Sequence, residues 1–535
     1  MKRAKTFSNA TRVIFRPELG HCPFCRTRLT FDHVIWEKHI IRLDGVVHAV
    51  SHGYRCSRCH GPVYRSAEAE SLALKYGTFG LDVIVRIGVL RYRDHLTRTE
   101  IHARLQQEGI PICERHVQNL YESYLVLIRC DLATTVERIR PTVMDHGGLV
   151  LSIDGIQPDK GNETLYLVRD ALTSTTLAAE NLLSGNAEAI KGLLRPVLEL
   201  GLPILGVVTD GQLSIRKAVH ELLPDTPYQY CQYHYLKDAA APLVDQDRKL
   251  KTQLKKSLRG LKRVEDHLQD DHSVAGRVLL GFCSALRALL LERGCPPLTL
   301  PGLMIFERLQ LIRHSLQRCL QRFPHARLQA LLRLIAKTDR YAAWYETLQL
   351  QHGWLVQLAH MLDPEHEAGT PSPEARQRAQ TAFLEYVDSL GVHGFDPLHS
   401  VLIENIRGYT KGFLPGLFTC FEHKLLPRTN NSLERFIRQS KARYRRITGR
   451  RSWSIYILRE GEFAVFVDVQ EPEEEQVQRL SRIADVAYRT RRQQWHHRRE
   501  PTRQRWRFRQ DPNTFLANLE AEWHSLHVDA QRHPV

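Results

Sequence analysis

Helical spacing of apolar residues marks one stretch of the chain, residues 79–130. Within it, Thr97 or Thr99 is placed to cap a helix that ends near Gly109, and a second helix is expected from about Cys113. A helix, a short glycine-containing turn and a second helix predict a helix-turn-helix. An ordinary helical linker domain is the alternative interpretation.

The hydrophobic pattern changes its period at Gly148. The runs "GGLVLSID", "ETLYLVRD" and "TSTTLAAEN" are short and rich in β-forming residues. An amphipathic helix follows, and its apolar face is formed by Ile190, Leu193, Leu194 and Val197. Next come the apolar strand "LPILGVVTD" and a second helix, "IRKAVHELLP". Three strands, a helix, a strand and a helix predict an α/β sheet.

Residues from about 240 to 425 show helical periodicity almost throughout. The segments "IFERLQLIRHSL" and "LQALLRLI" each place apolar residues along one face. No strand signal interrupts this block, and the proline-rich "DPEHEAGTPSPEA" predicts a loop or hinge inside it. We therefore expect one large helical insertion or domain.

Four of the eleven cysteines form two Cys-x-x-Cys pairs near the N-terminus, Cys22 with Cys25 and Cys56 with Cys59. The segment between the pairs reads as short strands with a turn at Asp44-Gly45. Two such pairs can hold one tetrahedral Zn²⁺, and the whole resembles a zinc ribbon. A redox pair or free thiols are the alternatives. Four nearby histidines are candidate substitute ligands: His21, His33, His52 and His60.

The length and the net charge of the chain indicate a multidomain protein that binds a polyanion. The 535 residues are enough for three or four domains. Lys and Arg total 75 against 59 Asp and Glu, and the net charge of +16 predicts a polyanionic partner, most commonly nucleic acid. A basic protein without such a partner is the alternative. No segment reaches the ~18 apolar residues of a membrane span, and no secretory signal follows the basic N-terminus, so we expect a cytosolic protein.

Two aspartates end predicted strands of the α/β sheet. Asp154 closes "LVLSID" and Asp210 closes "ILGVVTD". If these strands are neighbours, both carboxylates lie at one edge of the sheet, where ligands collect. Like charges held together repel unless a cation lies between them, and Mg²⁺ prefers carboxylate oxygens. An aspartate that merely caps the following turn is the alternative for each.

A third acid, Glu434, lies in "LLPRTNNSLERF", at the start of a basic helix. Delivered to the same edge, it would complete a site for two Mg²⁺ ions, which suits phosphodiester chemistry. A favourable charge near a helix N-terminus is the alternative. Other acids compete for the three positions: Asp159, Asp170, Asp225, Asp238, Glu422, Glu460 and Glu462.

Three segments are candidates for DNA contact. The second helix of the helix-turn-helix would expose Arg115, His116, Gln118 and Asn119. The basic run after Glu434 would lie beside the DNA backbone: Arg435, Arg438, Lys441, Arg443, Arg445 and Arg446. The arginine-rich segment 489–509 interleaves Trp495, Trp506 and Phe508, which suits phosphate contacts with base stacking, or is a merely solvated tail.

"LSIDG", "VVTDG", "YCQYHYLKDA" and "RTNNSLERF" together resemble a DDE transposase with a ribonuclease H-like catalytic domain. The resemblance is to the Mutator-like group and to insertion-sequence transposases with an N-terminal zinc ribbon, and it covers about residues 145–465. It implies that Asp154, Asp210 and Glu434 bind two Mg²⁺ (or Mn²⁺) ions. The motif residues that it assigns a supporting role are Cys231, His234, Asn430 and Asn431.

The resemblance also implies an activity. The enzyme would bind element ends in double-stranded DNA, hydrolyse a phosphodiester and join the freed 3′-OH to target DNA. Synapsis of two ends implies at least a homodimer, in the cytoplasm at the nucleoid, with no membrane partner. A catalytically silent DNA-binding regulator and a ribonuclease H-like nuclease that does not join strands are the alternatives.

The expected architecture is multidomain α/β. We predict a zinc ribbon at 1–70, a helix-turn-helix domain at 71–140, the first part of the ribonuclease H-like core at 141–240, a helical insertion at 241–424, the last part of the core with the third acid at 425–470, and a basic C-terminal tail at 471–535.

Overall fold

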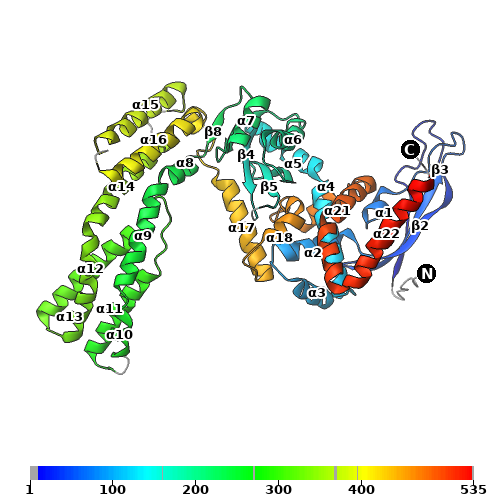
Figure 1. Ribbon diagram of the computed structural model, residues 1–535. Coiled ribbons are helices and arrows are strands. Elements are labelled where there is room, and N and C mark those ends of the chain that lie inside the picture. The colour runs from blue at the N-terminus through cyan, green and yellow to red at the C-terminus, as the bar shows by residue number, and fades with distance from the viewer. Residues whose placement is uncertain (1–9, 159–160, 269–270, 367–369, 394–395, 533–535) are drawn as a thin grey trace. The chain divides into compact units, whose positions relative to one another are not determined.

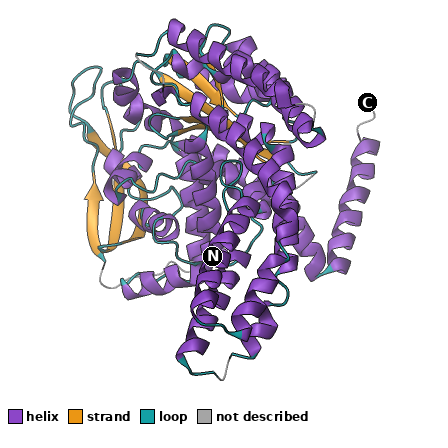
Figure 2. Cartoon of the chain, turned by 90° about the vertical axis from the view of Figure 1, so that its left-hand side faces the viewer, coloured by secondary structure: helices purple, strands orange, loops and turns teal. Residues whose placement is uncertain are grey.

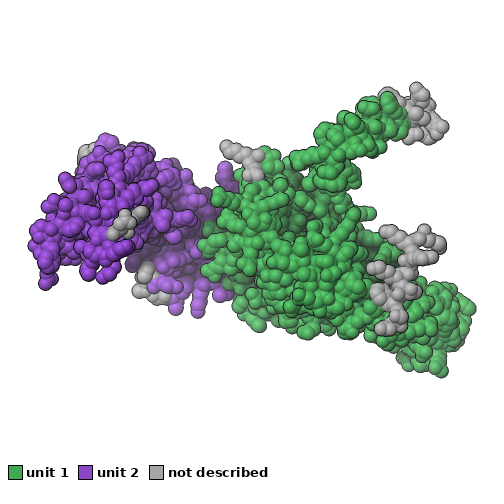
Figure 3. All heavy atoms as spheres, turned by 90° about the horizontal axis from the view of Figure 1, so that it is seen from below, with its two compact units in different colours: residues 1–147, 155–202, 433–535 green, residues 148–154, 203–432 purple. Residues whose placement is uncertain are grey.

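The computed structural model describes residues 10–158, 161–268, 271–366, 370–393 and 396–532. The chain is a mixed α/β protein in which helix predominates (Figures 1 and 2). It divides into two compact units (Figure 3). The first comprises residues 1–147, 155–202 and 433–535, and the second comprises 148–154 and 203–432. The finer division into six segments stays a prediction.

A three-stranded sheet begins the first unit. Its strands are β1 (Thr11–Phe15), β2 (Thr30–Arg42) and β3 (Gly45–Arg55), in the order β1-β3-β2. The expected turn at Asp44-Gly45 joins β2 to β3, and Gly45 has a φ of +134°, which favours glycine. The two strands are 13 and 11 residues long, so the short strands expected here are in fact a long antiparallel pair.

Helices follow the sheet: α1 (Ala67–Ser71), α2 (Leu81–Tyr92), α3 (Arg98–Gln107), α4 (Glu114–Cys130) and α5 (Leu132–Asp145). Thr97, not Thr99, caps α3, in a capping box with Glu100. Cys113 is the N-cap of α4, as the sequence predicted. Helices α2, α3 and α4 pack on one another, and the C-terminal part of α4 is buried all round.

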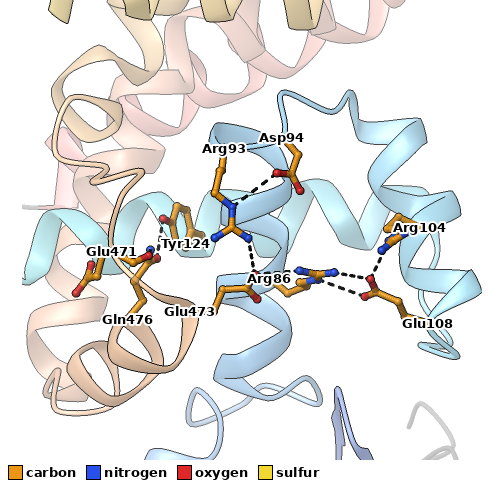
Figure 4. A network of polar contacts seen from close by, with 9 residues as sticks. All are labelled: Arg86, Arg93, Asp94, Arg104, Glu108, Tyr124, Glu471, Glu473 and Gln476. Atoms are coloured by element: carbon orange, nitrogen blue, oxygen red, sulfur yellow. Dashed lines mark hydrogen bonds and ion pairs between the residues drawn. The ribbon is translucent and has the colours of Figure 1, made fainter.

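The segment from residue 471 forms three helices: α20 (Glu473–Leu480), α21 (Asp485–Gln510) and α22 (Pro512–Arg532). Helix α20 packs against α2, and α21 packs against α4. Figure 4 shows how α20 is attached. The guanidinium of Arg86 donates to Glu108 at 2.6 Å and to Glu473 at 2.9 Å, and the hydroxyl of Tyr124 donates to Gln476 at 3.0 Å.

The second sheet has five strands: β4 (Leu149–Ile156), β5 (Thr164–Asp170), β6 (Thr176–Leu182), β7 (Ile204–Thr209) and β8 (Tyr228–Tyr230). Their order is β6-β5-β4-β7-β8. Strands β5 and β6 are antiparallel, whereas β4, β7 and β8 are parallel. Helices α6 (Ala187–Leu198) and α7 (Leu213–Leu222) form where the pattern predicted them, before and after β7, and the short β8 is an addition that the pattern did not indicate.

Most of the second unit is helical. Its helices are α8 (Gln232–Ala239), α9 (Ala241–Ser257), α10 (Leu261–Asp266), α11 (Val274–Leu290), α12 (Pro301–Arg322), α13 (Ala326–Ala336), α14 (Ala342–Met361), α15 (Pro373–Ser389) and α16 (Pro397–Leu417). They share one hydrophobic core, and no strand occurs among the described residues from 241 to 424. The expected proline-rich break separates α14 from α15.

Helix α17 (Asn431–Thr448) is followed by α18 (Ser454–Tyr456), a π-helical turn (Ile457–Gly461) and α19 (Glu462–Ala464). The apolar side of α17, with Leu433, Phe436 and Ile437, belongs to the same core cluster as Leu165 of β5 and Ala179 of β6. Along the described part of the chain, every helix is too short or too polar to cross a membrane.

Candidate functional site

The four cysteines of the two Cys-x-x-Cys pairs meet at one point. Their Sγ atoms all lie within 4.8 Å of one another, with 4.0 Å between Cys22 and Cys59 and 3.5 Å between Cys25 and Cys56. Four thiolates ~2.3 Å from a tetrahedral zinc ion would be about 3.8 Å apart, so the spacing fits such an ion. Cys22, Cys25, Cys56 and Cys59 could therefore hold a metal such as zinc.

The two pairs have the same backbone geometry. The residue directly after each second cysteine, Arg26 and His60, has a positive φ, of 58° and 46°. Its N–H donates to the carbonyl of the first cysteine of the pair, at 2.9 Å and 3.1 Å. Hydrogen bonding with Thr27, first with its side chain and then with its backbone, lowers the pKa of Cys25 to about 6, which favours the metal-binding thiolate. Among the described residues, no histidine joins the four cysteines in this group.

Asp154 and Asp210 lie on neighbouring strands. Asp210 directly follows β7, whereas β4 continues for two residues beyond Asp154, so Asp154 does not close its strand as expected. Strands β4 and β7 run parallel, and Ile153 pairs with Thr209 in their register. Asp154 and Asp210 are the next residues, and both are half-buried. The N–H of Gln212 donates to the Asp210 carboxylate at 2.9 Å, within the turn that leads to α7. The expected pairing of strands is confirmed, and it places both carboxylates at one edge of the sheet.

Asn430 of the Thr-Asn-Asn turn is bound to that edge. Its side chain is 1% exposed, its amide oxygen accepts from the hydroxyl of Ser152, and its Nδ2 donates to the carbonyl of Ile153 at 3.4 Å. Its backbone N–H points to Cys231 Sγ at 3.3 Å. Asn431, in contrast, is exposed. Asn430 and Asn431, for which the sequence predicted the same supporting role, therefore have different surroundings.

Cys231 and His234 lie at the start of α8. Cys231 is the N-cap, is fully buried, and donates its N–H to the carbonyl of Thr209 at 2.8 Å, which attaches α8 to the end of β7. His234 is half-buried in the first turn. The C-terminal half of β4, the end of β7, the N-terminus of α8 and the loop that holds Asn430 thus converge.

Glu434 is half-buried in the first turn of α17, four residues after Asn430. By its neighbours in space it belongs to the first unit. The basic residues that follow it are exposed or half-buried along α17: Arg435, Arg438, Lys441, Arg445 and Arg446. Arg443 is different, because its half-buried guanidinium lies 5.6 Å from the ring centre of Tyr92.

Several of the acids that were alternatives to Asp154, Asp210 and Glu434 have other hydrogen-bond or ion-pair partners. The Asp170 carboxylate is buried and accepts from the N–H and hydroxyl of Thr173, and Glu422 forms an ion pair with Arg376 at 3.0 Å. Glu460 accepts from the hydroxyl of Tyr121 at 2.9 Å, and burial raises the pKa of Glu462. Asp159 lies outside the described residues. Asp225 and Asp238 are exposed and half-buried, respectively.

The residues of α4 that were predicted to contact DNA differ in exposure. Arg115 is exposed at the start of the helix, whereas Gln118 donates to Glu122 at 3.2 Å. Glu122 in turn accepts from Arg499 and from the indole N–H of Trp495, both on α21. Gln118 is therefore part of the contact between α4 and α21, and its side chain is committed within the protein.

The aromatic residues of segment 489–509 are not equivalent. Trp495 is 0% exposed and packs edge-on against Phe463, with ring centres 4.9 Å apart. Trp506 and Phe508 are 62% and 44% exposed. Trp495 is a core residue that cannot stack on a base, whereas Trp506 and Phe508 remain accessible.

Ser152 is the residue that the sequence reasoning overlooked at this edge. It is buried in β4 and its hydroxyl donates to Asn430. A polar residue inside the otherwise apolar run "LVLSI" was the available signal, because buried polar groups need a partner. No model of a known protein family matches the chain, and no curated protein matches it either.

Proposed function

We propose that this protein is a DDE-type DNA transposase whose catalytic residues are Asp154, Asp210 and Glu434. One observation carries the proposal. Asp154 and Asp210 directly follow the paired residues Ile153 and Thr209 of two adjacent parallel strands, and the Thr-Asn-Asn turn that precedes Glu434 is bound to the same part of β4 through Asn430. The succession of three strands, helix, strand and helix supports a ribonuclease H-like core.

The donor set suits Mg²⁺ or Mn²⁺. Asp154 and Asp210 offer carboxylate oxygens, the ligands that hard divalent ions prefer, from adjacent register positions of neighbouring strands. Glu434 follows the anchored Asn430 by four residues, or about 6 Å of helix. When bound, two such ions supply electrostatic stabilisation to the attacking and leaving oxygens of a phosphodiester. The four-cysteine cluster is proposed to hold one structural Zn²⁺.

The residues of the chain then have separate tasks. Asn430 fixes the loop before α17, so that Glu434 is presented from a rigid helix start. The accessible cations of α17 bind phosphates beside the reacting bond, and Arg115 and Asn119 of α4 contact the element end. Water attacks phosphorus and releases the 3′ oxygen, and the resulting 3′-OH attacks a phosphodiester of the target DNA with release of its 3′ oxygen.

The test uses the sequences that flank the coding gene as labelled duplexes, with Mg²⁺, and compares wild type with Glu434→Gln. Glu404→Gln is the matched control, because Glu404 is an exposed acid of α16. We expect wild type and the control to cleave and join DNA, and Glu434→Gln to bind the same duplex while both steps fall by at least ~100-fold.

Each other result has a different meaning. An active Glu434→Gln variant would show that Glu434 is only a charge at a helix start. Cleavage without joined strands would favour the ribonuclease H-like nuclease. Specific binding without any reaction would favour the catalytically silent DNA-binding regulator.

A further inference from the structure

The helical insertion carries an array of cations that the proposed reaction does not use. Lys256 lies in the last turn of α9, Arg259 in the turn that follows, and Lys262 in the first turn of α10. Arg333 lies in the last turn of α13, and Lys337 is its C-cap. All five side chains are accessible to solvent. We call these five residues the insertion patch.

Two contacts bring the parts of the insertion patch together. Gly260, between Arg259 and Lys262, lies so close to Leu334 that a Cβ added at Gly260 would be 3.1 Å from the Leu334 Cδ1 atom. The guanidinium of Arg340 donates to the hydroxyl of Ser257 at 3.3 Å. The cations of the patch are sequence neighbours of these contacts, and α10 also packs against α13, so the end of α9, α10 and the end of α13 bring the cations together at one junction.

The cations of the patch have no acidic partner among the described residues. Of the nearby acids in the described part of the chain, Glu265 binds Arg287 and Asp339 binds Arg313, and the exposed Asp266 at the end of α10 forms no ion pair with the patch. Positive charge is also crowded along α9, where burial and then the charge of Lys251 lower the pKa of Lys255. Such an array attracts a polyanion.

The surface around the patch favours a phosphate backbone over a protein partner. In the described residues 241–268 and 326–341, no large apolar side chain is among the exposed ones. A protein interface normally has an apolar centre, whereas contacts to DNA phosphates are made by Arg and Lys side chains and carry no sequence information.

We propose that the insertion patch binds the sugar-phosphate backbone of duplex DNA, independently of sequence, as a second DNA contact besides α17. The inference rests on the proposed function, because that function supplies duplex DNA as the substrate. It assigns the helical insertion a role in holding the DNA.

The test measures the salt dependence of binding to a fluorescent duplex of arbitrary sequence. The patch variant is Arg259→Gln, Lys262→Gln and Lys337→Gln. The control removes three arginines of the same insertion, from α11 and α12: Arg277→Gln, Arg318→Gln and Arg322→Gln. Both variants lose equal charge, so a difference between them reports position and not net charge.

We expect the patch variant to bind the duplex about tenfold or more weakly at low salt. The slope of log K against log [NaCl] should decrease in magnitude by about 2–3, close to one for each phosphate that the variant no longer binds. The control variant should keep most of the binding affinity and most of the slope. Equal slopes for the patch variant and wild type would overturn the proposal. Weakened binding of RNA duplex alone would overturn it in favour of RNA.

This outcome is separable from that of the catalytic test, because binding is measured without any reaction. If the patch variant has a reduced slope but wild type does not cleave DNA, the insertion patch is supported and the transposase activity is contradicted. If the slope is unchanged and wild type cleaves DNA, the transposase activity is supported and the insertion patch is contradicted.

Discussion

Neighbouring residues of one motif have very different environments in this protein. Asn430 and Asn431 are adjacent in the Thr-Asn-Asn turn, yet the first is buried with hydrogen bonds to β4 and the second is exposed. A similar contrast separates Arg443, held beside Tyr92, from the exposed Arg445 on the same helix. A motif read from sequence therefore names a group of candidates, and burial distinguishes the anchoring residue from its neighbours.

Replacing Asn430 by Ala should lower the free energy of unfolding by about 1–3 kcal/mol, because the buried Ser152 hydroxyl and Ile153 carbonyl lose their partner. Asn431→Ala should change it by no more than about 0.5 kcal/mol. Urea unfolding of both variants checks this. An equal effect of the two substitutions would contradict the assignment of Asn430 as the anchor.

At the scale of elements, the N-terminal sheet has the four-cysteine cluster at one end. The cysteines lie on two turns, one before β2 and one after β3, and both turns contribute to one small buried cluster with Leu29, Tyr54 and Tyr64. A metal ion bound by both turns would fix the ends of the pair of long strands. Binding energy of this kind becomes folding energy for the element.

We predict about one zinc ion per chain in the purified protein, and its loss in Cys22→Ser, since three thiolates do not close a structural site. Cys113→Ser is the control, because Cys113 is exposed and outside the cluster. Metal analysis gives the content, and amide exchange of β1 to β3 should accelerate after chelation. Equal zinc in both variants would show that the cluster is not the binding site.

At the scale of the whole molecule, the C-terminal helices complete a core that begins far earlier in the chain. Leu480 of α20 and Trp495 of α21 belong to the same buried cluster as Val85 of α2 and Leu125 of α4. The basic segment is thus a structural part of the first unit, and its arginines divide between internal partners such as Glu122 and exposed positions.

Trp495→Ala should destabilise the first unit by about 3–5 kcal/mol, because it leaves a large cavity beside Phe463 and removes a donor from Glu122. Trp506→Ala, on the same helix, should change stability by no more than about 0.5 kcal/mol. Thermal unfolding followed by circular dichroism compares the two. A similar midpoint for both variants would argue against burial of Trp495.

The spacing of apolar residues was sufficient to predict an element and its buried residues wherever that element packs on the core through one face. The apolar positions predicted for α6, Ile190, Leu193, Leu194 and Val197, are its buried residues. The helical character of the described residues from 241 to 424 and the turn at Asp44-Gly45 also agree with the prediction. These features depend on spacing and turn chemistry between near neighbours, which the sequence records directly.

Only the tertiary structure decided the pairing of distant segments. It showed that Asn430 reaches β4 across 278 residues of sequence, and that Trp495 is core while Trp506 is exposed. A charged, aromatic segment has the same composition whether it is solvated or packed. The sequence by itself determined the elements and the candidate chemistry, whereas burial and partners depend on which surfaces meet when the chain closes on itself.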